Sequence, residues 1–426
     1  MSPTGQAPDR PFLPYPSRLI VETSSRCNLE CIMCVKRSQQ APEGELDLAL
    51  FRRLAPAFPR LESLVLNGIG EPLLHPGLES MVALARSSMP ASARIGFQSN
   101  GSLMDQARAR ALIEAGLDTA CISADAVTPR LFASIRRGAR LSSAESAIAI
   151  LDAARRDARA SGFRLGLEFV AMRSNLAELP PLVSWAAERG VDFILVSQLF
   201  PYERAFAADA AYDPHLDTAL SLREKYRHRA RAIGQRLEDY RRVFMKYDKD
   251  EGELALVGLV DEMAQEALAA GISLRIEGLL ERDDARAEVS ARFFAEAERV
   301  AEGLGLSLVL PALVPRSRRE CEFVEGGSAF VSWTGEVHPC YFLWHRYACY
   351  IDGKEKQVQS RSFGSLAESG ILSIWQSEAF SAFRRNVMRY DYPYCFNCGF
   401  ALCDYVEGGQ FETDCHLNEE PCAACL

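Results

Sequence analysis

Near the start of the chain stands the stretch that decides the fold, Arg18-Leu-Ile-Val-Glu-Thr-Ser-Ser-Arg-Cys-Asn-Leu-Glu-Cys-Ile-Met-Cys34. It joins a short β-branched run to three closely spaced cysteines. Further short apolar runs alternate with longer amphipathic stretches as far as Gln198, which is the pattern of strand–helix units around a parallel sheet. The predicted strands are Leu19–Thr23, Ser63–Asn67, Ile95–Ser99, Ala120–Ser123, Leu165–Val170 and Phe193–Val196, and the predicted helices between them include Ser142–Arg159 and Leu179–Glu188.

Six such units predict an α/β fold built on a partial (β/α)6 TIM-like barrel, because no segments match the closing strands of a full eight-stranded barrel. From Pro214 to Glu302 the composition turns to Ala, Glu, Arg and Leu at helical spacing, which predicts a helical insert. Thr218–Arg242 and Leu259–Ala269 are its expected helices. Two runs, Ala270–Ile276 and Gly303–Val309, each predict a glycine cap followed by a strand.

The expected organisation has four parts. We expect a flexible N-terminal segment (1–17), the barrel (18–200), a mainly helical insert or linker (201–315) and a small cysteine-rich domain (316–426).

Composition excludes several classes of function. The 426 residues include 48 Lys and Arg against 57 Asp and Glu, a net charge of −9, so no basic field favours nucleic acid. No apolar stretch has the length of a membrane helix, and the N-terminal segment lacks the apolar core of a secretion signal. We therefore expect a cytoplasmic protein without a nucleic-acid or membrane partner. Thirteen cysteines, an odd number, then favour metal binding over a disulfide framework.

The first cysteines, Cys27, Cys31 and Cys34, form a C-x3-C-x2-C pattern directly after the first predicted strand. A zinc site normally needs four protein ligands, and no fourth Cys or His follows nearby. Three thiolates on a four-iron cluster would leave one iron open. The pattern resembles the radical S-adenosylmethionine (SAM) enzymes. The resemblance implies a [4Fe–4S] cluster whose open iron binds SAM, and reductive cleavage of SAM to a 5'-deoxyadenosyl radical.

Turns after the next three strands strengthen the resemblance. Asn67-Gly-Ile-Gly-Glu-Pro72 looks like the family's Gly-Gly-Glu-Pro turn, Gln98-Ser-Asn-Gly101 resembles its Thr-Asn-Gly turn, and Ile122-Ser-Ala-Asp125 resembles its Ser-x-Asp segment. Each turn alone is common chemistry, but their order at successive strand ends is specific. The resemblance implies that SAM is bound by Gly68, Gly70, Glu71, Ser99, Asn100, Ser123 and Asp125. Arg136 is expected either to pair with the SAM carboxylate or to be a solvated helix residue.

A second cysteine set resembles the SPASM extension of radical SAM enzymes. Thirteen residues separate Cys321 from Gly335, four more separate Gly335 from Cys340, and a C-x2-C pair follows. The later spacing departs from the family's pattern. The resemblance implies two auxiliary [4Fe–4S] clusters held by Cys321, Cys340, Cys395, Cys398, Cys403, Cys415, Cys422 and Cys425. A zinc ribbon formed by the two C-x2-C pairs, Cys395 with Cys398 and Cys422 with Cys425, is the competing reading.

The remaining cysteines and nearby aromatic residues have simpler expected roles. Cys121 lies within a predicted strand and is expected in the core, and Cys349 is expected to be a buried thiol. Tyr341, Trp344, Tyr347 and Tyr350 would either line a substrate cleft or pack a small domain.

The resemblance implies a radical SAM enzyme that modifies a peptide or protein substrate and takes its electron from a reduced flavodoxin or ferredoxin. Short strings, Leu199-Phe-Pro-Tyr202 and the ending Asp414–Leu426, are similar to maturases of metalloenzymes such as tungsten-cofactor oxidoreductases. The alternatives are a small-molecule dehydrogenase or epimerase with the same chemistry, and a non-catalytic electron-transfer or scaffold protein. A glycine-rich turn for methionine speaks against the last alternative. No residue is singled out as the catalytic acid or base.

Overall fold

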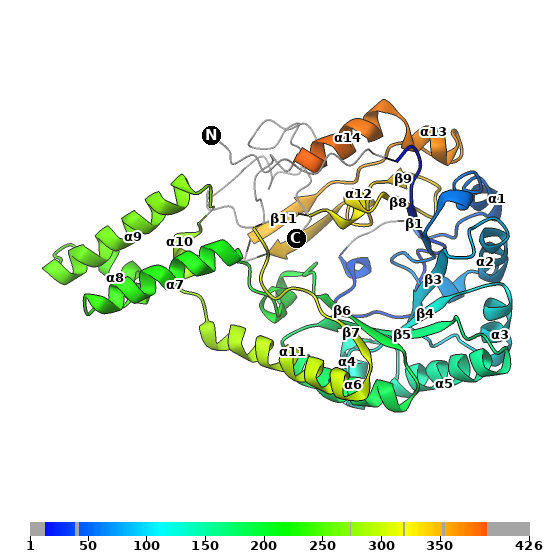
Figure 1. Ribbon diagram of the computed structural model, residues 1–426, viewed down its shortest axis with the longest axis horizontal. Helices are drawn as coiled ribbons and strands as arrows, with labels where there is room; N and C mark the ends of the chain where they lie inside the picture. The colour runs from blue at the N-terminus through cyan, green and yellow to red at the C-terminus, as the bar shows by residue number, and fades with distance from the viewer. Residues whose placement is uncertain (1–12, 39–41, 273, 318–319, 352–353, 390–426) are drawn as a thin grey trace.

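The structure is a computed structural model that describes residues 13–38, 42–272, 274–317, 320–351 and 354–389. In these residues the centre of the molecule is a nine-stranded sheet with the order β7-β6-β5-β4-β3-β2-β1-β8-β9 (Figure 1). Its strands are β1 (Arg18–Val21), β2 (Ser63–Val65), β3 (Arg94–Ser99), β4 (Thr119–Ser123), β5 (Arg164–Ala171), β6 (Phe193–Gln198), β7 (Ser307–Val309), β8 (Ser328–Val331) and β9 (Val337–His338).

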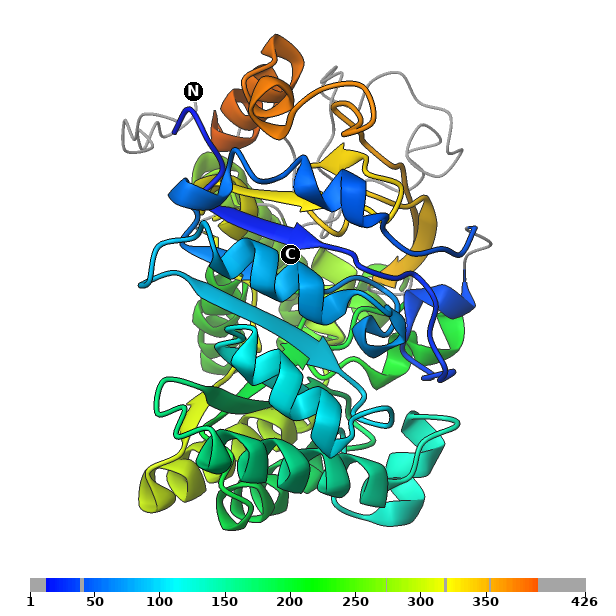
Figure 2. The same ribbon diagram turned by 90° about the vertical axis from the view of Figure 1, so that its right-hand side faces the viewer.

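The six predicted strands are confirmed as β1 to β6. They are neighbours in chain order, and every pairing among them is parallel. Parallel neighbours need a crossover between them, and helices supply it on the outer side of the curved sheet (Figure 2). These outer helices are α1 (Leu48–Arg52), α2 (Leu78–Arg86), α3 (Gln106–Glu114), α4 (Pro129–Ile135), α5 (Leu141–Asp157) and α6 (Leu179–Glu188).

Strand β5 shows how the sequence builds the barrel wall. Leu165, Leu167 and Phe169 are fully buried, whereas Glu168 and Val170, on the other face, keep partial exposure. Gly166 sits where any Cβ would overlap the ring of Phe193 on β6, so glycine lets the two strands approach. One strand thus covers the outer core and presents its alternate residues to the barrel interior.

Three strands from outside the predicted barrel segment (18–200) extend the barrel sheet. β7 pairs in parallel with β6 and confirms the strand expected in Gly303–Val309. At the opposite edge β8 pairs in parallel with β1, and β9 pairs antiparallel with β8. The cysteine-rich part of the chain is therefore joined to the barrel through backbone hydrogen bonds. A separate hairpin of β10 (Tyr347–Ile351) and β11 (Lys354–Val358) lies near the open side of the barrel in Figure 1.

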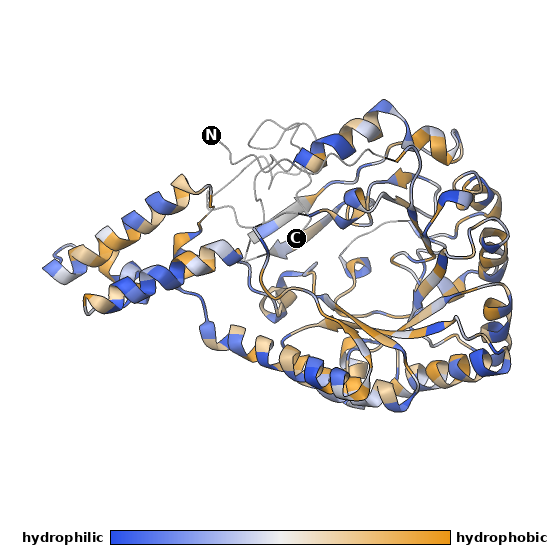
Figure 3. Ribbon diagram, viewed as in Figure 1, coloured by the Kyte–Doolittle hydropathy of each residue, from blue (hydrophilic) through white to orange (hydrophobic). Residues whose placement is uncertain are grey.

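The helical insert projects from the barrel as a unit (Figure 1). It contains α7 (Asp217–Ala232), α8 (Tyr240–Phe244), α9 (Glu251–Ala269) and α10 (Ile276–Leu280). These helices bury their own apolar cluster, and Figure 3 shows hydrophilic residues interspersed with hydrophobic ones along them. The cluster consists of Leu222, Tyr226, Ala230, Leu237, Val243, Leu256, Leu259, Val260, Met263, Ala267 and Leu280.

Two expectations for the insert are wrong in detail. The single helix predicted at Thr218–Arg242 is interrupted, because α7 ends at Ala232 and Gly234 takes a left-handed φ of 74°. The strand predicted at Ala270–Ile276 does not form in the described part of that run. Ile272 and Leu274 pack against the insert's apolar residues instead, and α10 begins at Ile276. The predicted helix Leu259–Ala269 forms the second half of α9.

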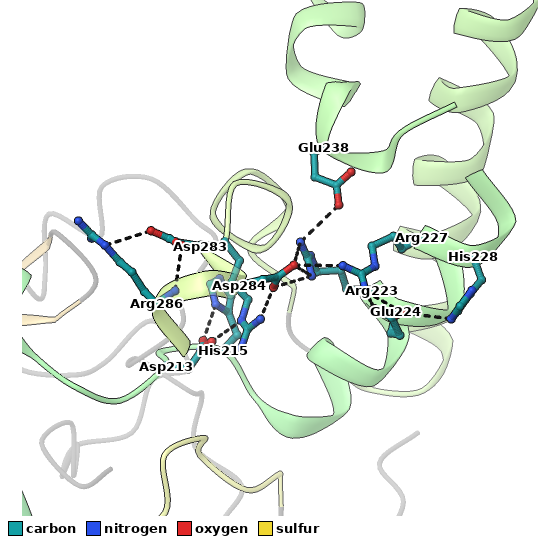
Figure 4. Close-up of polar contacts among 11 residues, drawn as sticks. Asp213, His215, Arg223, Glu224, Arg227, His228, Glu238, Asp283, Asp284 and Arg286 are labelled. Atoms are coloured by element: carbon teal, nitrogen blue, oxygen red, sulfur yellow. Dashed lines mark hydrogen bonds and ion pairs between the residues drawn. The ribbon is translucent and has the colours of Figure 1, made fainter. Parts of the chain in front are cut away.

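Ion pairs fasten the insert where it meets α11 (Asp284–Leu304), the helix that packs along α6 (Figure 4). Asp284 accepts hydrogen bonds from Arg223 and Arg227 of α7, both at 3.1 Å, and also pairs with Arg282. Arg282 in turn pairs with Asp213, which accepts a 2.8 Å contact from His215. The base of the insert is therefore held by charged groups and its body by apolar packing.

The last described helices close the barrel edge near the N-terminus. They are α12 (Glu322–Glu325), α13 (Ile371–Trp375) and α14 (Glu378–Arg389). The indole nitrogen of Trp375 donates to the carbonyl oxygen of Leu13 at 2.8 Å, and the Ser17 amide donates to Gly327 at 2.9 Å. Among all described helices, not one has both the length and the apolar character that crossing a membrane requires.

Candidate active site at the carboxyl ends of the strands

The three-cysteine loop leaves the carboxyl end of β1 and is pinned to the segment after α4. Within it, the Glu30 amide donates to Arg137 at 3.0 Å and the Ile32 amide donates to Ile135 at 2.9 Å. Cys27, Cys31 and Cys34 are all partly exposed, and none of the three is in a disulfide. The loop thus presents three reduced thiols at the barrel mouth, where parallel α/β barrels place their sites.

These thiols lie in a setting that disfavours the free thiolate. Burial is the largest cause of a raised pKa for all three, and for Cys31 it raises the pKa to about 11. Negative charge on Cys34 further raises the pKa of Cys27 and of Cys31, so loss of a proton from one thiol disfavours its loss from the others. A bound metal reverses this balance, because a coordinated thiol loses its proton.

The thiols fit a cluster better than a single ion. In the described residues, no group of three or more His, Cys, Asp or Glu side chains is gathered closely enough to hold one metal ion. A single zinc ion requires all its sulfur ligands at about 2.3 Å, whereas the thiolates of an iron–sulfur cube bind different irons. Three thiols on one short loop are therefore consistent with a [4Fe–4S] cluster.

The glycine turn after β2 packs directly on this loop. A Cβ at Gly70 would overlap the carbonyl oxygens of Ser24 and Arg26, and one at Gly68 would overlap the side chain of Glu22. Glycine is thus required at both positions by close approach of backbone and side chain. The Glu71 amide also donates to the Arg26 carbonyl at 2.7 Å. Loop and turn form one packed unit beneath the barrel mouth.

Glu71 serves a role that sequence reasoning did not foresee. Its carboxylate is buried and accepts hydrogen bonds from Ser99 Oγ at 2.7 Å, the Asn100 amide at 2.8 Å and the Leu73 amide at 3.0 Å. Burial nevertheless raises the pKa of Glu71, although these donors oppose the shift. The side chain expected to accept the SAM ammonium therefore already joins the turns after β2 and β3.

Asn100 carries the connection back to the cysteine loop. Its side-chain amide donates to Asn28 Oδ1 at 2.9 Å, next to Cys27. Its own Oδ1 accepts from the Ser102 amide at 2.9 Å, which closes the turn. The structure thus joins the predicted residues Glu71, Ser99 and Asn100 by hydrogen bonds, and Gly68 and Gly70 lie in the closely packed turn that leads to Glu71.

A second corner forms where β4 ends. Asp125 is fully buried, and its Oδ2 lies 2.6 Å from Arg136 Nε. Arg136 is itself buried, and its Nη1 lies 4.0 Å from Cys31 Sγ. Of the two alternatives for Arg136, that of a solvated helix residue is therefore wrong. Ser123, at the end of β4, is also buried in this corner of the barrel. The Arg136 guanidinium stabilises negative charge both on Asp125 and near the cysteine loop.

Between these corners and the aromatic residues after Cys340 lies a cavity of about 340 Å³. Three of the four aromatic residues that the sequence singled out, Tyr341, Trp344 and Tyr347, line it, so the expectation of a cleft is confirmed for them. Tyr350 does not line this cavity. From the barrel, the cavity is lined by Ile20, Met33, Val35, Asn67, Gly68, Ile69, Gln98, Glu168, Val170, Ser197, Gln198, Leu199, Phe200 and Tyr202.

Sequence reasoning missed Glu168. It stands on β5 beside Ser123 of β4 and faces the cavity. Burial raises the pKa of Glu168 to about 7, Arg136 lowers it and Asp125 raises it further. The sequence signal that could have identified Glu168 is an acidic residue flanked by apolar residues within a predicted central strand.

The remaining predicted metal residues are only partly described. Cys321, at the start of α12, and Cys340, after β9, are both buried. Cys395, Cys398, Cys403, Cys415, Cys422 and Cys425 lie outside the described residues. The choice between auxiliary clusters and a zinc ribbon therefore stays a prediction. Cys121 is buried in β4, as expected, and Cys349 is buried in β10.

Comparison with known protein families agrees with this geometry. Residues 21–168 match the model of the radical SAM superfamily, and residues 321–399 match SPASM, described as an iron–sulfur cluster-binding domain. This chain is a SPASM-type radical SAM enzyme. Its cofactors are the [4Fe–4S] cluster and SAM.

Relatives of this radical SAM enzyme match different shares of its chain. A tungsten-containing aldehyde ferredoxin oxidoreductase cofactor-modifying protein of Pyrococcus furiosus is 29% identical over 96% of this chain and 94% of its own length. The PqqA peptide cyclase of Gluconobacter oxydans is 32% identical but spans 42% of this chain and 47% of its own. The crystal structure of Streptococcus suis SuiB bound to S-adenosylmethionine has a TM-score of 0.52 at 13% identity, covering 91% of this chain and 72% of that one, which supports the fold.

The bound cofactors would supply reductive cleavage of SAM and the organic radical that results. The protein's own contribution is positional. Cys27, Cys31 and Cys34 offer the thiolates, the Gly70 turn allows close backbone approach, and Arg136 supplies positive charge. The cavity next to this site, lined largely by aromatic and aliphatic side chains, would hold the substrate beside the cluster-binding loop.

Proposed function

We propose that this radical SAM enzyme modifies a peptide or protein substrate during the maturation of a metalloenzyme. The observation that carries the proposal is the end-to-end similarity to the Pyrococcus furiosus cofactor-modifying protein, which extends through the insert and the SPASM region. Relatives that share about 40% of this chain, by contrast, have names as different as GTP 3',8-cyclase and PqqA peptide cyclase. Similarity over the whole chain is the stronger guide to the substrate.

We assign the site residues as follows. Cys27, Cys31 and Cys34 hold the SAM-binding cluster, and SAM is contacted by Gly68, Gly70, Glu71, Ser99, Asn100, Ser123, Asp125 and Arg136. Support comes from their two buried corners around the cysteine loop. For Glu71 the contact to SAM uses the carboxylate's remaining acceptor capacity, since three hydrogen bonds already occupy part of it.

We further propose two auxiliary clusters held by Cys321, Cys340 and the six later cysteines, an electron from a flavodoxin- or ferredoxin-type donor, and a cytoplasmic location. A reducing compartment suits thirteen cysteines of which the three in the first loop must stay reduced.

The test uses the full-length enzyme, reconstituted anaerobically with iron and sulfide. It is incubated with SAM, a reductant and polypeptides encoded by adjacent genes, and each polypeptide is analysed by mass spectrometry. The proposal expects a mass change in one polypeptide that requires SAM and is accompanied by 5'-deoxyadenosine. Turnover of a small molecule with every polypeptide unchanged would favour the dehydrogenase or epimerase alternative.

A further inference from the structure

The charge inside the cavity is confined to one side chain. Of its lining residues Glu168 alone is an Asp, Glu, Lys or Arg, and the histidine among them, His345, is neutral because burial lowers its pKa to about 3. Among the described residues the Glu168 carboxyl has neither a hydrogen-bond partner nor an ion-pair partner. Arg136, the cation that lowers the pKa of Glu168, forms its ion pair with Asp125 instead.

An unpaired carboxyl among mostly apolar and aromatic cavity residues is costly, even though Glu168 keeps partial exposure. Its neighbours on the same face of β5, Gly166 and Val170, are apolar, and an apolar side chain at position 168 would satisfy the strand equally well. A largely desolvated carboxyl without a counter-ion commonly marks a site whose partner arrives with a ligand. The missing partner of Glu168 must therefore be a cation or a hydrogen-bond donor.

Aromatic rings in the lining of the same cavity favour a cation. Phe200, Tyr202 and Tyr347 form a cluster with ring centroids 5.0 to 6.0 Å apart, and Phe342 lies 5.5 Å from Phe200. Aromatic faces attract positive charge, and a carboxylate in the same lining completes a cation-binding site.

Polar atoms of the cavity lining are also left without partners among the described residues. Trp344 Nε1, His345 Nε2 and Gln198 Oε1 are buried and have none among the described residues. All three residues line the cavity, and Trp344 and His345 are at least nine-tenths buried. Buried polar groups are nearly always satisfied in folded proteins, so several orphans around one cavity indicate a polar ligand.

We propose that this cavity is a substrate subsite for a cationic group, an ammonium or guanidinium such as a lysine or arginine side chain, with Glu168 as its counter-ion. The inference rests on the proposed function, because it takes the substrate to be a polypeptide. It goes beyond that proposal by naming the side-chain class that is placed next to the radical-forming site. SAM is the other cation that reaches the barrel mouth, so the experiment must separate the two.

The experiment measures binding to the full-length, reconstituted enzyme saturated with SAM, by anaerobic titration calorimetry. The probes are Nα-acetyl-lysine methylamide and Nα-acetyl-norleucine methylamide, which differ by the ammonium group. Wild type is compared with Glu168→Gln, which keeps the shape and removes the charge. Glu114→Gln, the same change at an exposed position of α3, is the matched control. The affinity for SAM is measured separately in all three proteins.

We expect wild type and Glu114→Gln to bind the lysine probe about ten-fold or more tightly than the norleucine probe, as a charge-assisted contact implies. Glu168→Gln should bring the ratio close to one and leave SAM affinity unchanged. Equal binding of both probes by wild type, or no binding of the lysine probe, overturns the proposal. A loss of SAM affinity in Glu168→Gln also overturns it, because Glu168 would then serve SAM. Discrimination between the probes without any polypeptide modification would leave the subsite standing and reject the proposed function.

Discussion

Glu71→Gln tests whether the carboxylate that joins the two SAM-side turns does so through its charge. The Glu71 Oε1 atom accepts from Ser99 Oγ and the Leu73 amide, and Oε2 accepts from the Asn100 amide. A glutamine keeps two of these bonds if its oxygen takes the Oε1 position. Its NH2 group then faces the Asn100 N–H, and two donors oppose each other in a buried place.

The size of the effect follows from that single conflict. A lost hydrogen bond to a charged group, with its donor left buried, costs about 1.5 to 3 kcal/mol. We expect the free energy of unfolding to fall by about that amount, and SAM affinity to fall about ten-fold or more because the Asn100 turn shifts against Asn28. Thermal unfolding and SAM titration of the variant, beside Glu114→Gln, measure both. If the variant equals this control in both measurements, the turn does not depend on the carboxylate and the reasoning is refuted.

Three further predictions address the loop, the insert and the metal content. Gly70→Ala should lower iron loading of the first cluster, because its Cβ overlaps two carbonyl oxygens, whereas Gly303→Ala, with open space around its Cβ, should load normally; equal iron contents would contradict this packing. Asp284→Asn should speed proteolytic cleavage around the insert relative to Asp248→Asn, an exposed control; equal rates would mean that apolar packing alone holds the insert. Burial would raise the pKa of Asp284, but hydrogen bonds and charges from Arg223 and Arg282 outweigh burial and lower this pKa. The ion pairs of Asp284 should therefore protect the insert from proteolysis at neutral pH, and this protection should be lost as the pH falls below about 4. Metal analysis should give about twelve irons per chain, from three four-iron clusters, with negligible zinc; about four irons and one zinc would establish the ribbon instead.

The parts of the fold that the sequence predicted depend on local signals. The six barrel strands were identifiable because each is a short apolar run between amphipathic stretches, and the cysteine loop because its ligands lie within eight residues. The pairing of β8 with β1 could not be predicted in this way, since Ser328 and Arg18 are far apart in the chain and both strands are short. Only the folded sheet brings them together.

The same limit applies to the site. The motif identified Glu71, yet its three hydrogen bonds arise from turns that follow different strands. The pairing of Asp125 with Arg136 depends on how α4 returns its last turn to the barrel. Glu168 was missed because its importance depends on the phase of β5 and on aromatic residues that the chain supplies much later. Such long-range juxtapositions leave no periodic trace in a single sequence.

The first cysteine loop is expected to build the centre that cleaves SAM. The direct measurement is 5'-deoxyadenosine formed by anaerobically reconstituted enzyme with SAM and a strong reductant, quantified by mass spectrometry in wild type and in the triple variant Cys27→Ala, Cys31→Ala, Cys34→Ala. We predict product from wild type and none from the variant, which should retain the iron bound by its C-terminal cysteines. Equal 5'-deoxyadenosine formation by the two proteins would contradict the account.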